Sequence, residues 1–133
     1  MSEKTLHRAV CDYLRYHYPY VIFNTDLSGS MRLTMGQAVA IKAPRSNRGF
    51  PDLVIYEPRG IYHGLFIELK KEGERLYTKE YTSGRVNKDS RPVSPHIAEQ
   101  IQCLVALRER GYKAEFAVGF NQAKELIDNY LNQ

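Results

Sequence analysis

The residues best suited to chemistry are an aspartate and a glutamate-lysine pair on two neighbouring apolar segments. Asp52 stands at the start of the first segment, and Glu68 and Lys70 lie at the end of the second, residues 65–70. Side chains alternate between the two faces of a strand, so Glu68 and Lys70 share one face and the aliphatic residues between them share the other. The spacing therefore predicts one strand with a charged face and an apolar face.

The two segments are predicted to pair as a hairpin. Glu57-Pro58-Arg59-Gly60 lies between them and has the composition of a chain-reversing turn. If Asp52 lies roughly opposite Glu68, both carboxylates point into one pocket. A slip of one residue would send them to opposite faces, so this register is a hypothesis.

Paired carboxylates of this kind predict a metal site. Two carboxylates that lie close together raise each other's pKa unless a cation lies between them. Mg²⁺ and Mn²⁺ suit such oxygen ligands, and the backbone carbonyl of Leu69 would complete the protein's share. Lys70 would then orient the attacking water or stabilise the charge that develops on phosphorus. The residues indicate metal-dependent cleavage of phosphodiester bonds.

A simpler interpretation of the same residues is that Pro51-Asp52 opens a strand and that Glu68 and Lys70 form its solvated face. The combination of motifs favours the site. Gly49-Phe50-Pro51-Asp52 followed by Glu68-Leu69-Lys70 resembles the PD-(D/E)xK nuclease signature, and in particular its VRR-NUC branch, the virus-type replication-repair nucleases. The resemblance covers most of the chain, and the long segment after Lys70 departs from the family pattern.

The resemblance implies two further site residues. It places a catalytic glutamine on a helix after the Glu-x-Lys motif, where Gln100 stands, and an acidic metal ligand in the first helix, for which Glu3 is the candidate. Each has an ordinary alternative. Glu3 suits the dipole of a helix that begins there, and Gln100 is otherwise a polar flank of its helix.

The resemblance also implies the fold and the activity. It predicts a small α/β domain over residues 1–133 with a restriction-endonuclease-like fold, in which helices flank a central mixed sheet. Stand-alone members of this branch look like Holliday-junction resolvases, so the expected function is a Mg²⁺- or Mn²⁺-dependent deoxyribonuclease in phage or bacterial DNA replication or repair. A homodimer is expected, because two sites related by a twofold axis suit paired cuts in a four-way junction.

Two other classes of function stay open. One is a nucleic-acid-binding module of the same fold that does not cut, although a pure binder has no need of clustered carboxylates facing phosphate. The other is a structural or adaptor protein whose basic surface serves solubility. A steep fall of DNA affinity with salt would speak against the adaptor.

Periodicity and capping residues predict the elements that position these residues. In chain order they are a helix from about Glu3 to His17, a short strand at 21–24, strands at 52–56 and 65–70, a helix from Ser94 to about Arg110, a third central strand at 112–118, and a last helix capped by Asn121. This order predicts an α/β arrangement with a mixed sheet.

Basic residues upstream of Asp52 are candidate DNA contacts. The chain has a net charge of +4 and a pI near 9.1, which favours a polyanionic partner. Residues 31–48 show little periodicity, and a solvated loop is the alternative for their cations. These cations are Arg32, Lys42, Arg45 and Arg48.

A second basic stretch follows the Glu-x-Lys motif. Residues 70–91 hold seven Lys or Arg against four Asp or Glu and have no apolar periodicity. We predict a flexible insertion at about 71–93, with Lys71 and Arg75 as candidate DNA contacts. This insertion is either a mobile flap, which folds against nucleic acid or against a second subunit, or a disordered surface loop.

Composition excludes several classes of protein. At 133 residues the chain is expected to be one domain with its own core. Cys11 and Cys103 match no metal or redox spacing, which favours reduced thiols in a cytoplasmic protein. A membrane protein is not expected, because no apolar run approaches the length of a membrane span and the N-terminus has no signal-peptide core.

Overall fold

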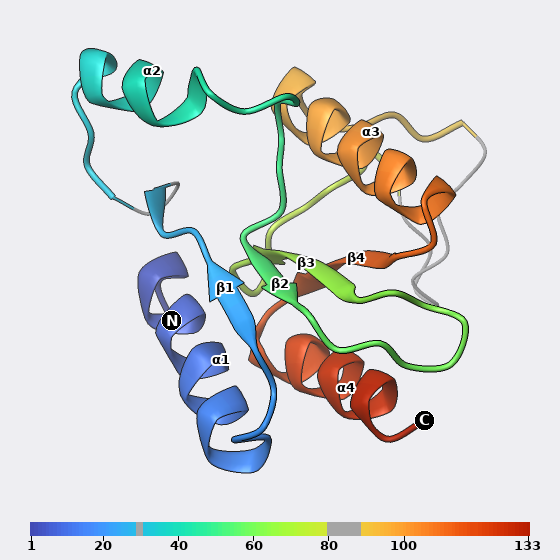
Figure 1. Cartoon of the computed structure of the whole chain (residues 1–133). Helices are drawn as coiled ribbons and strands as arrows, with labels where there is room; N and C mark the ends of the chain where they lie inside the picture. The colour runs from blue at the N-terminus through green and yellow to red at the C-terminus, as the bar shows by residue number, and fades with distance from the viewer. Residues whose placement is uncertain (29–30, 80–88) are drawn as a thin grey trace.

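A four-stranded mixed sheet forms the middle of the fold (Figure 1). The computed structural model describes residues 1–28, 31–79 and 89–133. The strand order is β1-β2-β3-β4; β2 is antiparallel to both β1 and β3, and β4 is parallel to β3. The strands are β1 (Phe23–Thr25), β2 (Leu53–Ile55), β3 (Leu65–Lys70) and β4 (Lys113–Val118). The predicted α/β fold is confirmed, but β4 ends the described sheet and is not central.

The predicted hairpin register is confirmed. Leu53 pairs with Ile67 across β2 and β3, and one more step along this ladder places Asp52 opposite Glu68. The connection between the strands turns where Arg59 and Tyr62 exchange backbone hydrogen bonds of 3.1 and 2.9 Å. The two carboxylates therefore leave the sheet on the same face.

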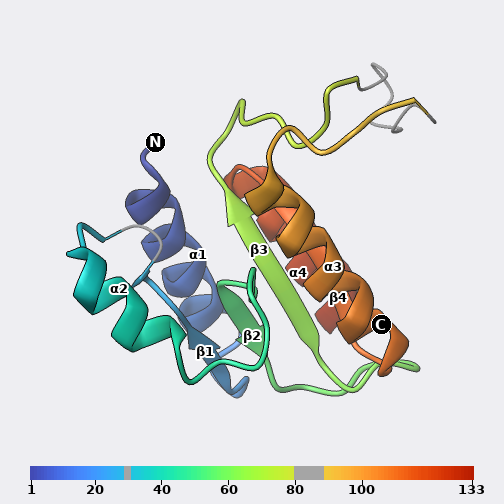
Figure 2. The same ribbon diagram turned by 90° about the horizontal axis from the view of Figure 1, so that it is seen from above.

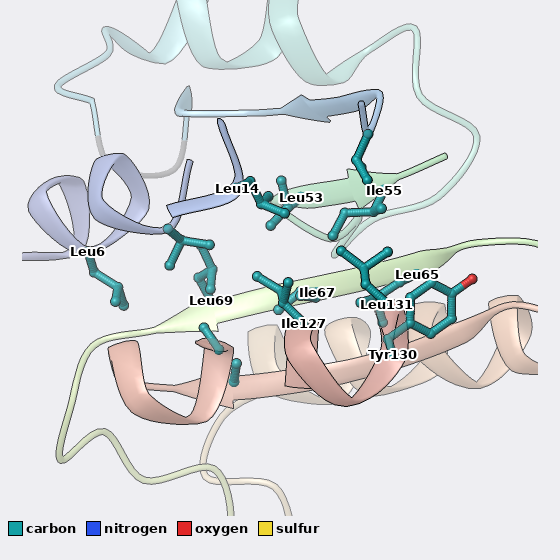
Figure 3. Packing of buried hydrophobic residues seen from close by; sticks show 14 residues of the cluster. Leu6, Leu14, Leu53, Ile55, Leu65, Ile67, Leu69, Ile127, Tyr130 and Leu131 are labelled. Atoms are coloured by element: carbon teal, nitrogen blue, oxygen red, sulfur yellow. The ribbon is translucent and has the colours of Figure 1, made fainter. Parts of the chain in front are cut away.

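The opposite face of the sheet holds the main core. Alternate residues of β3 point there and pack with α1 (Glu3–His17) and α4 (Phe120–Leu131), as Figure 3 shows. α3 (Pro95–Glu109) covers the charged face, where Leu104 packs on Phe66 and Ala114. In Figure 2 α3 runs alongside β3. One face of β3 thus secures the strand, and the other presents its charged side chains.

The helix boundaries follow local capping. α1 begins and ends as predicted, and the Ser2 side chain caps it by accepting from the Thr5 N–H at 3.1 Å. α4 begins earlier than predicted, because its N-cap is Gly119 and not Asn121. Gly119 has a φ of 85°. This left-handed conformation, which glycine adopts at little cost, turns the chain directly from β4 into α4.

The short helix α2 (Met35–Lys42) corrects the expectation of an irregular segment at 31–48. Thr34 and Gln37 form a capping box that starts it. No residue of α2 is buried, so the helix has no apolar stripe from which periodicity could have predicted it. α2 lies on the same side of the sheet as α3 (Figure 1).

The predicted flexible insertion at about 71–93 is described only at its two ends. These ends pair, since the Thr78 N–H donates to the Arg91 carbonyl at 2.8 Å and the Val93 N–H to the Leu76 carbonyl at 3.0 Å. Residues 80–88 lie outside the described residues, so its flexibility stays a prediction, as does the single domain. Cys11 and Cys103 are free and buried. No described helix is both long and apolar enough to cross a bilayer.

Candidate active site

The predicted catalytic residues meet in one cavity of about 850 Å³. Residues of α2, of α3, of the loop before β2 and of the end of β3 line it. The five acidic, basic and amide side chains singled out from the sequence all line it: Glu3, Asp52, Glu68, Lys70 and Gln100. The fold therefore gathers residues that lie far apart in the chain, and their roles stay predictions.

A backbone hydrogen bond holds Asp52. The N–H of Leu69 donates to Asp52 Oδ2 at 3.0 Å. A strand residue directs its N–H and its carbonyl to the same edge, so the Leu69 carbonyl also faces the Asp52 side of β3. The next carbonyl, of Lys70, accepts from Gly119 at 2.8 Å on the β4 side, which agrees with this alternation. The geometry is consistent with the predicted carbonyl ligand.

Glu68 is nearly enclosed, with an exposed fraction of 3%. Gln100 Nε2 donates to Glu68 Oε1 at 2.8 Å, and Lys70 Nζ lies 3.8 Å from the same oxygen. Two acceptors, Glu68 Oε2 and Gln100 Oε1, are buried without a hydrogen-bond partner among the described residues. Buried oxygens without a donor are costly unless something positive satisfies them, so these atoms fit a cation.

The pKa values of both carboxyl groups are displaced. Burial raises the pKa of Glu68 well above its ordinary range, and the neighbouring Asp52 charge raises it further. Burial also raises the pKa of Asp52, which a side-chain interaction with Glu68 and the hydrogen bond from the Leu69 N–H partly offset. Both ionised forms are therefore disfavoured without a counter-charge, and a divalent ion would supply that charge.

The cavity as a whole is also short of positive charge. Among its described lining residues, six are carboxylates and four are Lys or Arg: Glu3, Asp26, Asp52, Glu68, Glu74 and Glu99 against Lys42, Arg45, Arg48 and Lys70. Arg45 forms a salt bridge with Asp26, and Arg48 lies 3.8 Å from Glu99. A phosphate would be repelled from this cavity unless a cation is bound in it.

The metal ligands do not form a complete preassembled cluster. Within the described ranges, no three His, Cys, Asp or Glu side chains are placed to hold one ion. Glu3 nevertheless lines the cavity, and its charge contributes to the raised pKa of Asp52 and of Glu68. Asp52, Glu68 and the Leu69 carbonyl fit a cation, such as Mg²⁺, that keeps several waters. The metal role of Glu3 stays a prediction.

The predicted DNA-contacting cations fall into two groups. Lys42, Arg45 and Arg48 line the cavity. Arg32, Lys71 and Arg75 are exposed but do not line it, and Arg75 donates to the Thr78 carbonyl at 2.7 Å. The structure thus brings the first group to the site and leaves the second group outside it.

Two positioning features were missed from the sequence. A Cβ atom on Gly49, whose φ is +70°, would lie 2.6 Å from the backbone nitrogen of Gln100, so only glycine lets this loop lie against α3. His96 lines the cavity one turn before Gln100, and its Nε2 is 3.2 Å from the Gln100 amide nitrogen. The spacing of four residues on one helix was the signal for His96.

Comparisons with known proteins identify the fold. No family model matches the chain, and no curated protein matches it. The chain is similar to a solved structure named "VRR_NUC domain protein", with a TM-score of 0.65 and 22% identity over 99% of this chain and 89% of that one. A second structure, "VRR_NUC domain", matches with a TM-score of 0.47 and 20% identity over 94% of this chain and 97% of that one.

Proposed function

We propose that this chain, which has the fold of a VRR_NUC domain protein over nearly its whole length, is a divalent-metal-dependent nuclease that hydrolyses DNA. One observation carries the proposal. Asp52 and Glu68 share a cavity with a buried lysine, and an oxygen of Glu68 has no partner among the described residues. Buried carboxylates arranged in this way add nothing to stability on their own, which favours a functional reason for them.

Asp52, Glu68 and the Leu69 carbonyl would hold Mg²⁺ or Mn²⁺. When bound, the ion would neutralise charge on the phosphate and lower the pKa of the attacking water. Gln100 would keep Glu68 in place, since its amide donates to Glu68 Oε1. The Leu69 N–H would do the same for Asp52, to which it donates. Both carboxylates would thus be held before the ion arrives, as ligand-orienting hydrogen bonds do in metal sites.

Lys70 would act on the reacting groups. Lys70 as a whole is 5% exposed, and its ammonium group lies 3.8 Å from Glu68 Oε1. From there it would donate a hydrogen bond to the attacking water or to a non-bridging phosphate oxygen, where negative charge develops. The water oxygen forms a bond to phosphorus, the opposite P–O bond breaks, the water proton passes to solvent, and the leaving oxygen takes up a proton.

The expected substrate is branched DNA, cut by a homodimer in phage or bacterial replication or repair, in the cytoplasm. The basic chain and the cavity cations Lys42, Arg45 and Arg48 support a DNA substrate. The four-way junction and the twofold dimer stay predictions. Comparing junction with linear-duplex cleavage tests the first, and light scattering during size-exclusion chromatography tests the second.

The decisive experiment is cleavage of a labelled four-way junction and a matched linear duplex in Mg²⁺, Mn²⁺ or EDTA. We expect metal-dependent cutting by the native protein and none above background by Asp52→Asn or Lys70→Ala. Glu125→Gln is the control, because Glu125 is exposed on α4 and does not line the cavity. Circular dichroism would confirm that each variant is folded.

The alternative is a DNA-binding module of the same fold that does not cut. It would be the better account if the native protein binds DNA but leaves it intact in both metals. Cutting by both variants at the native rate would also refute the catalytic assignment, even if the protein is a nuclease.

A further inference from the structure

The candidate active site is lined by apolar side chains as well as by charges. Met35 and Val39 of α2 are 86% and 61% exposed, and both line the cavity that holds the paired carboxylates. Phosphate chemistry does not need an apolar wall, and water makes exposed apolar surface unfavourable. Apolar surface beside the reacting groups therefore indicates a part of the substrate other than its phosphates.

Two exposed aromatic rings line the cavities that Asp52 lines. Phe50, 39% exposed, lines the main cavity and also a smaller adjoining cavity of about 330 Å³. Its ring meets Phe66 edge to face at a centroid distance of 5.9 Å, which holds it in place. Tyr56 lines the smaller cavity and is 55% exposed. Asp52 lines both cavities, so each ring lines a cavity that a predicted metal ligand also lines.

These surfaces suit nucleobases only if the bases are unstacked. In a duplex the faces of the bases are covered by their neighbours, and a protein meets phosphates, sugars and groove edges. Aromatic side chains instead stack on the bases of single strands. The main cavity is also the size of a small-ligand site, so it holds a few nucleotides, and a duplex would only lie across its mouth.

One cation that is unpaired among the described residues, Lys42, favours nucleic acid over a second protein as the occupant once a metal ion offsets the carboxylates. Lys42 lines the main cavity beside Val39 and enters none of the salt bridges among the described residues. An unpaired cation next to the apolar wall suits a backbone phosphate whose base packs on that wall. A protein surface that covered α2 would instead have to bury this charge or pair it.

We propose that the two cavities form a binding site for unpaired DNA. Phe50 and Tyr56 stack on bases, and Met35 and Val39 pack against a neighbouring nucleotide. The inference rests on the proposed nuclease function and specifies its substrate. A branched DNA would be cut where its strands are unpaired, and an intact duplex would be a poor substrate.

The test measures binding without cleavage. Fluorescence anisotropy with Ca²⁺ in place of Mg²⁺ would compare a labelled single strand with the same sequence as a duplex. We expect the single strand to bind at least about tenfold more tightly. Phe50→Leu and Tyr56→Ala should each weaken single-strand binding about tenfold, the size of one lost base-aromatic stack. Tyr16→Ala is the matched control, since Tyr16 is 82% exposed and lines neither cavity.

A second readout reports stacking directly. A strand that carries 2-aminopurine should lose fluorescence on binding to the native protein and to the Phe50→Tyr variant, which keeps a ring. The loss should be smaller with Phe50→Leu, which keeps the packing on Phe66 without a ring. Circular dichroism would show that the variants are folded.

Several results would overturn the inference. Equal affinity for single strand and duplex would do so, as would an equal loss of affinity in the Tyr16→Ala control. Val39→Glu could turn a dimer into a monomer and leave single-strand binding unchanged. In that case a second copy of the chain covers α2, and the assignment of Met35 and Val39 to nucleotide binding is wrong. If the protein binds single strands as expected but does not cleave DNA, the nuclease proposal fails and the binding inference stands. The two can be separated because the binding comparison does not depend on cutting.

Discussion

Glu68 lies in a place that is unfavourable for a carboxylate. It is 3% exposed, it has a carboxylate neighbour in Asp52, and its Oε2 atom has no partner among the described residues. Lys70 Nζ, at 3.8 Å from Oε1, is too distant for a hydrogen bond. An arrangement like this lowers stability until a cation is bound, as is common where catalytic groups gather.

Replacing Glu68 by glutamine should separate stability from function. We expect Glu68→Gln to raise the free energy of unfolding of the metal-free protein by about 1 kcal/mol, because the raised pKa of Glu68 means that folding must protonate this buried group, and a neutral amide removes that cost. Cleavage should be lost. Urea denaturation in EDTA measures the first effect, and Mn²⁺ should raise the melting temperature of the native protein only. An equal rise in the variant would contradict the assignment of Glu68 as a ligand.

Gln100 is predicted to act on the metal site through Glu68. Gln100→Ala removes the donor to Glu68 Oε1, and we expect a roughly 10- to 100-fold loss of metal affinity or cleavage rate, the usual effect of losing a ligand-orienting partner. Metal titration followed by cleavage would measure both quantities. Gln102→Ala is the control, since Gln102 is exposed on the same helix. A variant that binds metal as the native protein does would refute the positioning role.

At the scale of elements, the loop before β2 and the helix α3 are held in direct backbone contact at Gly49. This contact links the strand that carries Asp52 to the helix that carries Gln100. An added Cβ would meet the backbone nitrogen of Gln100 at 2.6 Å and the carbonyl carbon of Glu99 at 2.7 Å. Neither backbone atom can move without shifting the helix itself.

Gly49→Ala should therefore impair both stability and catalysis. We expect a loss of about 2 kcal/mol, from the clash and from the left-handed φ of +70°, and a fall in cleavage that persists where the variant is still folded. Gly36→Ala is the control, because a Cβ at Gly36 of α2 meets nothing within 4 Å and should stabilise the helix by about 0.5 kcal/mol. Urea denaturation and cleavage assays compare the two.

α1 and α4 are joined by hydrogen bonds to one carboxylate. Tyr13 and Tyr18 donate to Asp128 Oδ1 at 2.5 and 2.6 Å, and Lys124 donates to Oδ2 at 3.0 Å. Burial, together with Asp128, raises the pKa of both tyrosines to about 12. Burial opposes ionisation of Asp128, but these three donors outweigh it and lower its pKa below the ordinary value.

This cluster predicts how stability depends on pH. The folded pKa of Asp128 is lowered, so its contribution is present above about pH 4 and is lost as the pH falls further. The tyrosines have raised pKa values, so their contribution is lost as the pH rises from about 10 towards 12. Asp128→Asn should cost about 2 kcal/mol at pH 7 and much less at pH 3. Urea denaturation at both pH values measures the difference, and an equal cost would exclude this linkage.

At the scale of the whole molecule, the charge balance of the main cavity is opposite to that of the chain. The chain carries a net charge of +4, yet the described lining of its main cavity holds more carboxylates than Lys or Arg. A bound metal would reverse this local balance. DNA binding should therefore strengthen when Ca²⁺ is added, and the basic surface should make the affinity fall with salt.

Lys42 is the cavity cation best placed to test whether this site contacts DNA phosphates. Lys42→Gln should weaken DNA binding similarly for different sequences and reduce the slope of log affinity against log salt by about 1. Lys124→Gln is the control, because Lys124 lies on α4, pairs with Asp128 and does not line the cavity. Anisotropy titrations over a range of NaCl concentrations give both slopes. An unchanged slope in Lys42→Gln would mean that Lys42 contacts no phosphate.

The sequence by itself determined the two strands that flank the predicted hairpin turn and the residues at the centre of the candidate site. Alternation along residues 65–70 predicted which face of β3 carries Glu68 and Lys70, because the pleat of a strand is local geometry. The start of α1 followed from Ser2, whose side chain caps the helix locally. The hairpin register was a hypothesis, and pairing across β2 and β3 decided it.

Only the tertiary structure decided what depends on contacts between distant segments. The approach of Gly49 to Gln100, the entry of Glu3 into the cavity and the place of β4 at the end of the described sheet all arise this way. α2 escaped prediction because none of its residues is buried, and burial is what produces a readable apolar period. The sequence also did not determine which cations line the cavity. Arg32, Arg45 and Arg48 all precede Asp52 in the chain, but of these three only Arg45 and Arg48 line it. Local sequence patterns predict local backbone geometry, whereas packing between distant segments brings the residues of a site together.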